Sequence, residues 1–427
     1  MKNYKKAILQ CSNAMIEIQK PIMILNSIEW PERIYREFKK NKFQKFPKLT
    51  QDLYRERPLG FDPDEKIQEF RLLQKRIQGF FGKNDGVGRI LIRNCQEYMQ
   101  AIGMLKARGT SDFYKFATLL YGSTHDHFLD EKTQIYDLGL TMKAVLKGIK
   151  YKYIEPKPTI SAPKAVRILS NRLKSYFHHD DVRVKLSDGI VSDAAAGSNY
   201  IKLKRDIKFT KSQLDIYEVH EGHVHVGTSL NGRAQPYCRW LAVGAPGMNV
   251  TQEGLAFTME ILTFKSNLRR IEKVNDRIIT LHMAEEGADF MDIFRYYRKK
   301  GIPERQAFER THRLFRGTLG KAGSVFTKDI SYERGFIAVY NFLSLAASLG
   351  IPHLIPFLFA GKIVLTDLPV LSDLYQEKIL TYPKYVPESI HDSKGLICWM
   401  AYSKFLNKLD FHKIEKNAIQ ILKKNRL

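Results

Sequence analysis

A run of histidines near the middle of the chain constrains its local geometry more than any other feature. In Tyr217-Glu218-Val219-His220-Glu221-Gly222-His223-Val224-His225, the imidazoles of His220 and His225 are five positions apart. In a regular α-helix, a separation of four leaves two side chains roughly 40° apart, whereas five leaves them roughly 140° apart. A single wide π turn absorbs the extra residue and returns both imidazoles to one face. The run therefore predicts a local distortion within a helix.

The same run carries the side chains of a metal site. An imidazole, a carboxylate and a second imidazole on one helix face suit Zn²⁺, with the carboxylate aimed at a metal-bound water. A later helix would supply a third ligand, Glu253, from Gln252-Glu253-Gly254-Leu255-Ala256. Glu260 lies two turns further on the same face, where it would hydrogen-bond a liganding imidazole. Thr210 and Gln213 form a capping box that begins the histidine helix.

Other interpretations fit these residues. His220 and His223, three positions apart, share a face of an ordinary helix and form a rival ligand pair. The histidines could equally be polar surface residues. Glu253 falls in the first turn of its helix, where the helix dipole favours a carboxylate without any metal. Glu260 could likewise be a surface carboxylate.

Alternating segments precede the histidine helix. Residues 182–186 and 200–205 alternate apolar and polar side chains, which is typical of β-strands. We expect a small sheet beside the metal-binding helix, with residues 200–205 as an edge strand that holds an extended peptide next to the metal. Pro63–Phe81 has apolar residues at helical steps. The predicted fold class is α+β and mainly helical.

Several motifs together resemble the QEGLA-motif proteins, the family that includes the microtubule-associated tyrosine carboxypeptidases. They begin with the His220-Glu221-x-x-x-His225 pattern and Gln252-Glu253-Gly254-Leu255-Ala256. The others are Asn231-Gly232-Arg233-Ala234-Gln235-Pro236, Arg313-Leu314-Phe315-Arg316-Gly317, Phe326-Thr327-Lys328-Asp329, Tyr332-Glu333-Arg334-Gly335, Phe359-Ala360-Gly361-Lys362 and Tyr382-Pro383-Lys384-Tyr385-Val386-Pro387. The resemblance extends roughly from Trp30 to Pro387.

The resemblance implies a zincin-like zinc carboxypeptidase that removes a C-terminal aromatic residue, Tyr or Phe. It implies His220, His225 and Glu253 as zinc ligands and Glu221 as the catalytic base. Such chemistry needs neutral imidazoles and an ionised Glu221, so activity should fall in acid. One departure is the Gly222-His223 pair, where the family pattern has an apolar residue followed by glycine; the extra imidazole would disturb the π turn or compete for metal.

A carboxypeptidase must also bind a free α-carboxylate, and Arg pairs with it bidentately. We expect Arg313 or Arg316 in this role, with Lys328 and Arg334 as alternatives; cations at a helix C-terminus are the other explanation of the two arginines. Tyr332 would donate to the oxyanion of the tetrahedral intermediate. It also begins an apolar stripe and would then be a core residue.

Two other classes of function remain open. A zinc aminopeptidase or endopeptidase would use the same metal site. A non-enzymatic, metal-stabilised binding protein, which uses its basic surface on polyanionic partners, is favoured if His223 closes a fourth coordination position. The residue pattern does not indicate an oligomeric state.

The net charge of +24 indicates attraction to polyanions, including acidic protein tails. Residues 33–57 are densely basic, with phenylalanines between the lysines. Bases could stack on these rings, but no nucleic-acid module is recognisable. An amphipathic segment that buries its phenylalanines under a basic face is the favoured interpretation.

The length of 427 residues predicts two lobes or one large elaborated catalytic domain. The closely spaced prolines of residues 155–158 disfavour helix and central strand, so we expect a mostly helical N-terminal lobe over residues 1–155 and a catalytic domain over 156–427. No signal peptide is visible at the N-terminus. The apolar stretch 336–371 is interrupted before a membrane span is complete. The four cysteines are scattered and have no disulfide-like spacing. A cytoplasmic location is expected.

Overall fold

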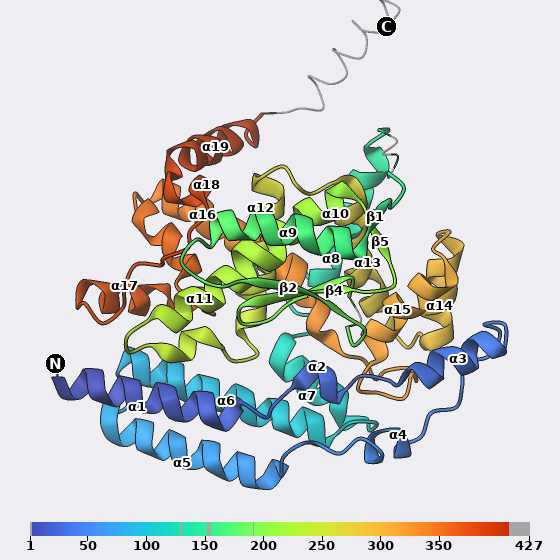
Figure 1. Ribbon diagram of the computed structural model, residues 1–427, viewed down its shortest axis with the longest axis horizontal. Coiled ribbons are helices and arrows are strands. Elements are labelled where there is room, and N and C mark those ends of the chain that lie inside the picture. The colour runs from blue at the N-terminus through green and yellow to red at the C-terminus, as the bar shows by residue number, and fades with distance from the viewer. Residues whose placement is uncertain (1, 129, 152–153, 155, 191, 410–427) are drawn as a thin grey trace, which may run out of the picture.

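The computed structural model describes residues 2–128, 130–151, 154, 156–190 and 192–409. It is mainly helical with two small sheets (Figure 1), which confirms the predicted α+β class. No helix within these ranges is both long and apolar enough to cross a bilayer.

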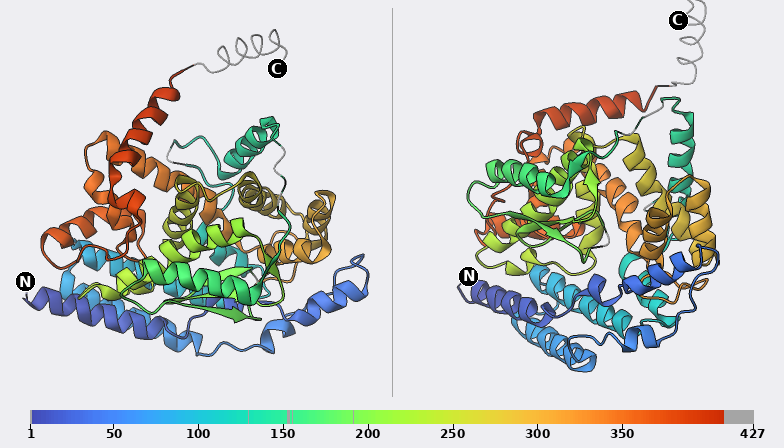
Figure 2. Two further views of the ribbon diagram at one scale, coloured as in Figure 1. Left: turned by 45° about the horizontal axis from the view of Figure 1, so that its top comes forward. Right: turned by 45° about the vertical axis from the view of Figure 1, so that its right-hand side comes forward.

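Three N-terminal helices, α1 (Lys2–Gln19), α5 (Pro63–Phe81) and α6 (Gly86–Lys106), run along one side of the molecule (Figures 1 and 2). α5 has the predicted bounds. It begins there because the Asp62 carboxylate accepts hydrogen bonds from the backbone N–H groups of Asp64 and Glu65, at 2.9 and 2.8 Å, and Pro63 fits the first turn.

The buried faces of these helices belong to the largest hydrophobic cluster, which also includes residues from the second half of the chain. Ile8 and Ile102 share this cluster with Val219 and Leu255, and all four are buried. The predicted division of the chain at residue 155 stays a prediction, and residue 155 itself lies outside the described residues.

The remaining helices surround this cluster and two neighbouring ones. The α-helices are α2 (Ile24–Ser27), α3 (Glu32–Lys40), α4 (Asp52–Arg55), α7 (Asp112–Tyr121), α8 (Ile135–Gly148), α9 (Ala162–Tyr176), α10 (Lys211–Tyr217), α11 (Gly227–Ala234), α12 (Met248–Leu262), α13 (Leu268–Glu285), α14 (Phe290–Lys299), α15 (Glu304–Phe315), α16 (Ser331–Ser348), α17 (Leu368–Gln376), α18 (Glu388–His391) and α19 (Ser393–Leu406). Short 3₁₀ helices cover Arg239–Ala242, Thr327–Ile330, Pro352–Phe359 and Leu365–Asp367, and the π-helix η1 covers Glu218–Val226.

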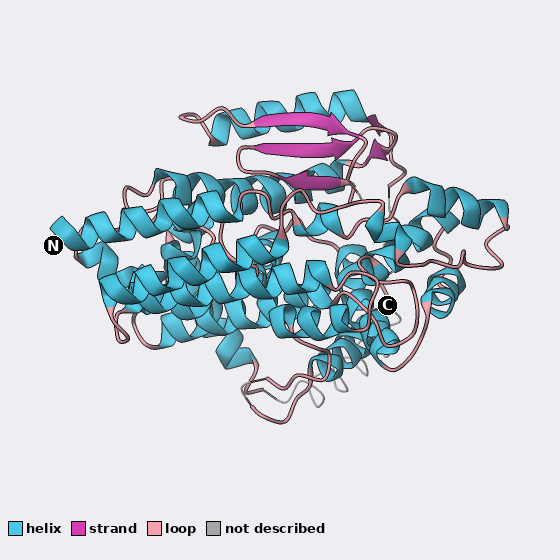
Figure 3. Ribbon diagram, turned by 90° about the horizontal axis from the view of Figure 1, so that it is seen from below, coloured by secondary structure: helices cyan, strands magenta, loops and turns pink. Residues whose placement is uncertain are grey.

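The larger sheet has three strands in the order β2 (Arg183–Ser187), β4 (Tyr200–Lys204), β3 (Ala194–Ala196). β4 runs parallel to β2 and antiparallel to β3. β1 (Ile160–Ser161) and β5 (Lys208–Phe209) form a separate antiparallel pair. In Figure 3 the sheet and α9 lie together at one border of the helical mass.

The sheet corrects one prediction. Residues 200–205 were expected to form an edge strand, but β4 lies in the middle, paired on both sides. The edge strand next to η1 is β3, the short alanine segment Ala194–Ala196. The prediction was wrong because alternation shows that a segment is a strand, whereas the order of strands depends on tertiary packing.

The central helices α12 and α16 approach each other through two glycines. A methyl group built on Gly254 would lie 2.1 Å from the carbonyl carbon of Gly335, and one built on Gly335 would lie 2.0 Å from the carbonyl oxygen of Val250. Side chains at these positions would force the backbones apart. The glycines therefore fix the distance between the two helices, and α12 carries Glu253.

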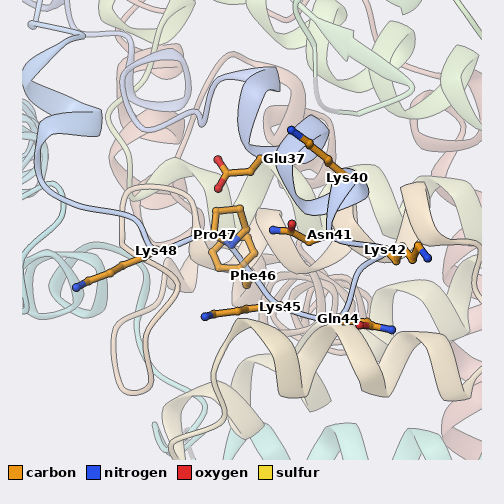
Figure 4. Close-up of a pocket in the computed structure, with 9 residues that line it drawn as sticks. All are labelled: Glu37, Lys40, Asn41, Lys42, Gln44, Lys45, Phe46, Pro47 and Lys48. Carbon is orange, nitrogen blue, oxygen red and sulfur yellow. The ribbon is translucent and has the colours of Figure 1, made fainter.

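The basic segment near α3 buries its aromatic rings. Phe38 is fully buried, and Phe46 stacks on Phe290 with ring centroids 3.9 Å apart. The lysines around it line an open hollow of about 720 Å³ (Figure 4): Lys40, Lys42, Lys45 and Lys48. Phe46 also lines this hollow, but because Phe38 is buried and Phe46 is stacked on Phe290, the structure favours the amphipathic interpretation over a platform for nucleic-acid bases.

Candidate metal centre

The helix that carries the histidines is distorted as the five-residue spacing predicted. α10 begins at the predicted capping box, where the backbone N–H of Thr210 donates to the Gln213 side chain at 2.8 Å and the Gln213 N–H donates to Thr210 Oγ1 at 3.1 Å. The chain then widens into the π-helix η1. At its end the N–H of Gly227 donates to the carbonyl of Gly222, five residues earlier.

This π turn brings His220 and His225 to one face, opposite Glu253 of α12. One donor atom from each of the three lies within 4.8 Å of the other two. Glu253 Oε2 is 3.4 Å from His220 Nε2 and 3.8 Å from His225 Nε2. Because zinc ligands lie about 2 Å from the ion, atoms at these separations need only small movements to share one.

The hydrogen bonds of Glu253 fit a metal ligand. Its Oε1 accepts from Lys328 Nζ at 3.0 Å, but its Oε2 is buried and has no hydrogen-bond partner among the described residues. A buried carboxylate oxygen without a partner is costly. Burial raises the pKa of Glu253, yet Lys328 and the two imidazoles outweigh burial and hold this pKa well below its usual range. The orphaned oxygen, aimed between two imidazole nitrogens, is what a bound cation would satisfy.

A second carboxylate fixes the orientation of His220. Its Nδ1 lies 2.7 Å from Glu260 Oε1, as predicted for Glu260. Glu260 in turn accepts two hydrogen bonds from Arg270, at 2.9 and 2.7 Å. With burial opposing it, the Arg270 guanidinium lowers the pKa of Glu260 to about 2, so this carboxylate is ionised. With Nδ1–H donated to Glu260, Nε2 of His220 is the nitrogen that faces Glu253, and it can bind a metal once its own proton is lost.

Without a metal, these groups retain a proton. Burial lowers the pKa of His220, but the nearby carboxylates of Glu253 and Glu260 outweigh burial and raise it to about 10. Burial lowers the pKa of His225. A cation at this position would therefore displace a proton from His220.

His223 lies outside the cluster, so the structure does not support the rival pair of His220 with His223. Its ring stacks on Tyr176, with centroids 4.0 Å apart and an interplanar angle of 27°. Burial lowers its pKa to about 4, so it is a neutral packing residue at pH 7. The extra imidazole neither prevents the π turn nor faces the three candidate ligands.

Glu221 follows His220 on the π-helix and lies beside the edge strand. Its Oε2 accepts a hydrogen bond from the backbone N–H of Ala196 in β3, at 2.9 Å. This bond holds the carboxylate in place and leaves its other oxygen available.

Sequence reasoning missed the residues that support His225 from behind. Lys362 Nζ donates to the backbone carbonyl of His225 at 2.9 Å and to Gln252 Oε1 at 3.0 Å. Gln252 Oε1 also accepts from Thr228 Oγ1 at 2.9 Å. The network ties the π-helix to α12 and to the loop that carries Lys362. Residues so distant in sequence give no local pattern, although Gln252 and Lys362 both lie in motifs noted above.

The four predicted carboxylate-binding cations have different surroundings. Arg313 Nε donates to Asp329 Oδ2 at 2.5 Å, and Lys328 contacts Glu253 as described. Arg316 is buried, and its Nε has no hydrogen-bond partner within the described ranges. Arg334 is instead partly exposed and forms an ion pair with Asp126 at 3.5 Å, so the structure does not bring it to the cluster.

Tyr332 lies between the candidate ligand His220 and Arg313. Its ring lies parallel to that of His220, with centroids 6.4 Å apart, and its hydroxyl oxygen accepts from Arg313 at 3.3 Å. Arg277, which the sequence reasoning missed, lies 4.2 Å above the Tyr332 ring. Tyr332 is also buried against Phe257, so it packs in a small apolar cluster as well as reaching Arg313.

The arginines form a buried surplus of positive charge. Arg313 and Arg277 approach Asp329 Oδ2 at 2.5 and 3.9 Å, and the charge of Arg316 also helps to lower the pKa of Asp329. Burial and repulsion by Arg313 lower the pKa of Arg316 to about 10. Arg277 Nη1 is buried with no hydrogen-bond partner in the described part of the chain. This arrangement can accept an anion.

A protein-family model described as "Microtubule-associated tyrosine carboxypeptidase" matches residues 36–408 of this chain. The match covers most of the sequence and includes every candidate ligand described above. A search of curated proteins found no match.

Proposed function

The chain belongs to the microtubule-associated tyrosine carboxypeptidase family, and from this premise we propose that it is a zinc metallocarboxypeptidase of the zincin type. It hydrolyses the peptide bond before a C-terminal aromatic residue, Tyr or Phe, of proteins or peptides. The observation that carries the proposal is the buried set of His220, His225 and Glu253, whose Oε2 lacks a partner, with Glu221 on the same π turn.

The metal would be held by His220 Nε2, His225 Nε2 and Glu253 Oε2. Bound there, Zn²⁺ would polarise the scissile carbonyl and acidify a water molecule. Glu221 takes the proton from the attacking water and delivers it to the leaving amino group. The Ala196 N–H keeps the Glu221 carboxylate in position for both transfers. Glu260 and Arg270 keep the imidazole of His220 in the required orientation.

Tyr332 stabilises the oxyanion. Because its hydroxyl oxygen accepts a hydrogen bond from Arg313, its own proton is free to be donated to the substrate. The donor matters most in the tetrahedral intermediate, where the charge on the carbonyl oxygen develops.

The free α-carboxylate of the substrate binds at the buried arginines. Arg316 and Arg277 each have a buried nitrogen without a partner in the described structure, whereas Arg313 and Lys328 are held by carboxylates of the chain. A bidentate or bridging carboxylate would satisfy these nitrogens and offset the surplus charge. Of the two arginines expected from the sequence, Arg316 is therefore the favoured ligand, and Arg277 joins it.

Acidic protein tails are the proposed substrate class, and the cytoplasm is the proposed location. The net charge of +24 attracts such tails before any contact with the site. The description of the family model, which names microtubules and tyrosine, agrees with this choice.

The decisive experiment uses mass spectrometry of peptides that end in Glu-Tyr, Glu-Phe and Glu-Ala after incubation with zinc-loaded protein. We expect loss of one C-terminal Tyr or Phe. A Glu221→Gln variant should bind zinc and release nothing, because the proton acceptor is gone. The proposal fails if zinc-loaded wild-type protein trims none of the three peptides.

Amidated versions of the same peptides separate the related activities. A carboxypeptidase should lose activity on the amide, whereas an endopeptidase should retain it and an aminopeptidase should shorten the other end. The non-enzymatic alternative relied on His223 as a fourth ligand, and the stacking of His223 on Tyr176 offers it no support.

A further inference from the structure

A second group of potential metal ligands lies between the loop 122–134 and the C-terminal end of α13. His125 comes from this loop, and His282 and Glu285 come from α13. One donor atom from each of the three lies within 4.8 Å of the other two. None of these residues belongs to the candidate metal centre described above.

The hydrogen bonds around Thr124 determine the tautomer of His282. Thr124 Oγ1 contacts both Glu285 Oε2 and His282 Nδ1, the latter at 3.0 Å. An ionised carboxylate cannot donate, so the single hydroxyl proton of Thr124 goes to Glu285. His282 Nδ1 must then donate to Thr124, and its Nε2 keeps the free lone pair that a metal requires. Glu260 fixes the tautomer of His220 in the same way.

The ring of His282 is held in place. Tyr136 stacks on it, with centroids 3.5 Å apart and an interplanar angle of 13°. The ring of His125 lies beside it at 5.1 Å between centroids. His125 is partly exposed, so it can turn its free nitrogen toward a shared ion without disturbing the core.

The local charge favours a cation although the whole chain is strongly basic. His125 Nε2 lies 3.2 Å from Glu286 Oε1, and Glu285, Glu286 and Asp137 act on His282. Arg334 of α16 approaches this loop and forms an ion pair with Asp126 at 3.5 Å. Imidazole nitrogens and a carboxylate are donors that Zn²⁺ binds in proteins. The Glu285 oxygens also accept hydrogen bonds from Tyr114, Ser123 and Thr124, so an ion would replace one of these donors.

We propose that His125 and His282, together with the carboxylate of Glu285, form a second site for a divalent transition metal such as Zn²⁺. The ion cross-links the loop 122–134 to the end of α13. Because α13 also carries Arg270 and Arg277, the cross-link would stabilise the helix that places these two arginines beside the candidate metal centre. This site is independent of the proposed peptidase activity.

Metal stoichiometry tests the proposal. Purified full-length protein is equilibrated with Zn²⁺, freed of unbound ion, and analysed by inductively coupled plasma mass spectrometry. His125→Ala should bind about one equivalent less than wild type. His127→Ala is the matched control, since His127 is an exposed residue of the same loop outside the cluster, and it should bind as much as wild type.

A second pair of variants keeps the result independent of the first centre. In a His225→Ala background, which removes a candidate ligand of that centre, Zn²⁺ should still raise the melting temperature, and adding His125→Ala should abolish this shift. The proposal is overturned if His125→Ala and His127→Ala bind equal amounts of zinc. It is also overturned if Zn²⁺ raises the melting temperature of the His225→Ala, His125→Ala double variant as much as that of His225→Ala alone.

Discussion

At the residue scale, His223 shows how an imidazole in a metal-like motif becomes a packing residue. It stacks on Tyr176, and burial lowers its pKa to about 4. An unfolded chain has a histidine pKa of about 6.5. The folded pKa lies below the unfolded value, so the neutral form contributes its full stability above pH 6.5. That contribution is lost as pH falls from 6.5 through 4.

Replacing this ring with one that cannot titrate should reduce the sensitivity to acid. In His223→Phe, the loss of unfolding free energy between pH 7 and pH 5 should be smaller than in wild type by about 2 kcal/mol. Urea denaturation of the metal-free proteins at pH 7 and pH 5 measures the unfolding free energies that this comparison needs. His127→Phe, at an exposed position, should follow wild type. Equal acid sensitivity of His223→Phe and wild type would show that His223 is not buried as described.

Lys362 allows a second prediction at this scale. Its ammonium group holds the His225 carbonyl and the Gln252 amide oxygen, and so positions one candidate ligand relative to α12. Lys362→Met keeps the aliphatic stem but removes both hydrogen bonds. Zinc affinity should fall by roughly 10- to 100-fold, the usual effect of losing an outer support.

Competition with a chromogenic chelator measures this affinity without any assay of activity. Lys115→Met, on the exposed side of α7, is the control and should bind zinc as wild type does. Unchanged affinity in Lys362→Met would remove its supporting role. If affinity falls as expected while the wild type releases no amino acid, the peptidase proposal fails but the network remains.

How much of the candidate site can be predicted from the sequence depends on how far apart in the chain the interacting residues are. The approach of His220 and His225 followed from spacing along one helix. The pattern offered Glu253 as a third ligand and the resemblance implied it, but its approach to the histidines could not be derived, because residues on different helices have no fixed relation. Arg277 was missed because a cation on an amphipathic helix is an ordinary surface residue until the neighbouring element is known.

At the element scale, the crossing of α12 and α16 sets the position of Glu253. The next residue, Gly254, meets the backbone of Gly335, which cannot move aside as a flexible side chain could. Gly254→Ala should therefore push the helices apart, lower the unfolding free energy by about 2–4 kcal/mol, and weaken zinc binding. Thermal denaturation and the chelator competition measure the two effects.

Gly79→Ala is the matched control, because a methyl group there would meet nothing within 4 Å among the described residues. In α5 this change should be neutral or stabilising by up to about 1 kcal/mol, since alanine favours helix. A Gly254→Ala protein as stable as wild type, with unchanged zinc affinity, would mean that the crossing tolerates a side chain.

The elements themselves were predictable to different degrees. The bounds of α5 and the start of α10 followed from capping residues, which act within one turn. The π turn followed from a conflict between a five-residue spacing and helical geometry. The position of β4 in its sheet did not follow, since a central and an edge strand of this length alternate alike.

At the scale of the whole molecule, the largest hydrophobic cluster joins the two halves of the chain. Helices from the first hundred residues and helices from the second half bury side chains in the same cluster, so changes in α1 or α6 reach the packing around α12. The sequence predicted the helical N-terminal part. It could not predict this shared burial, which depends on the approach of segments far apart in the chain.

Net charge supports a last prediction at this scale. A chain of +24 attracts an acidic peptide at long range, and salt screens that attraction within a Debye length of about 10 Å at 0.1 M. For a peptide with several glutamates before its C-terminal Tyr, kcat/KM should fall on the order of 10-fold between low salt and 0.3 M. Steady-state release of tyrosine measures it.

A peptide of the same length with each glutamate replaced by glutamine is the control. It keeps the C-terminal Tyr and the α-carboxylate, so its proposed contacts with Arg277 and Arg316 would be unchanged. Its kcat/KM should start lower and vary little with salt, because only the long-range attraction is missing. If both peptides lose activity in parallel, salt acts on the site itself, and the basic surface has no part in selecting acidic tails.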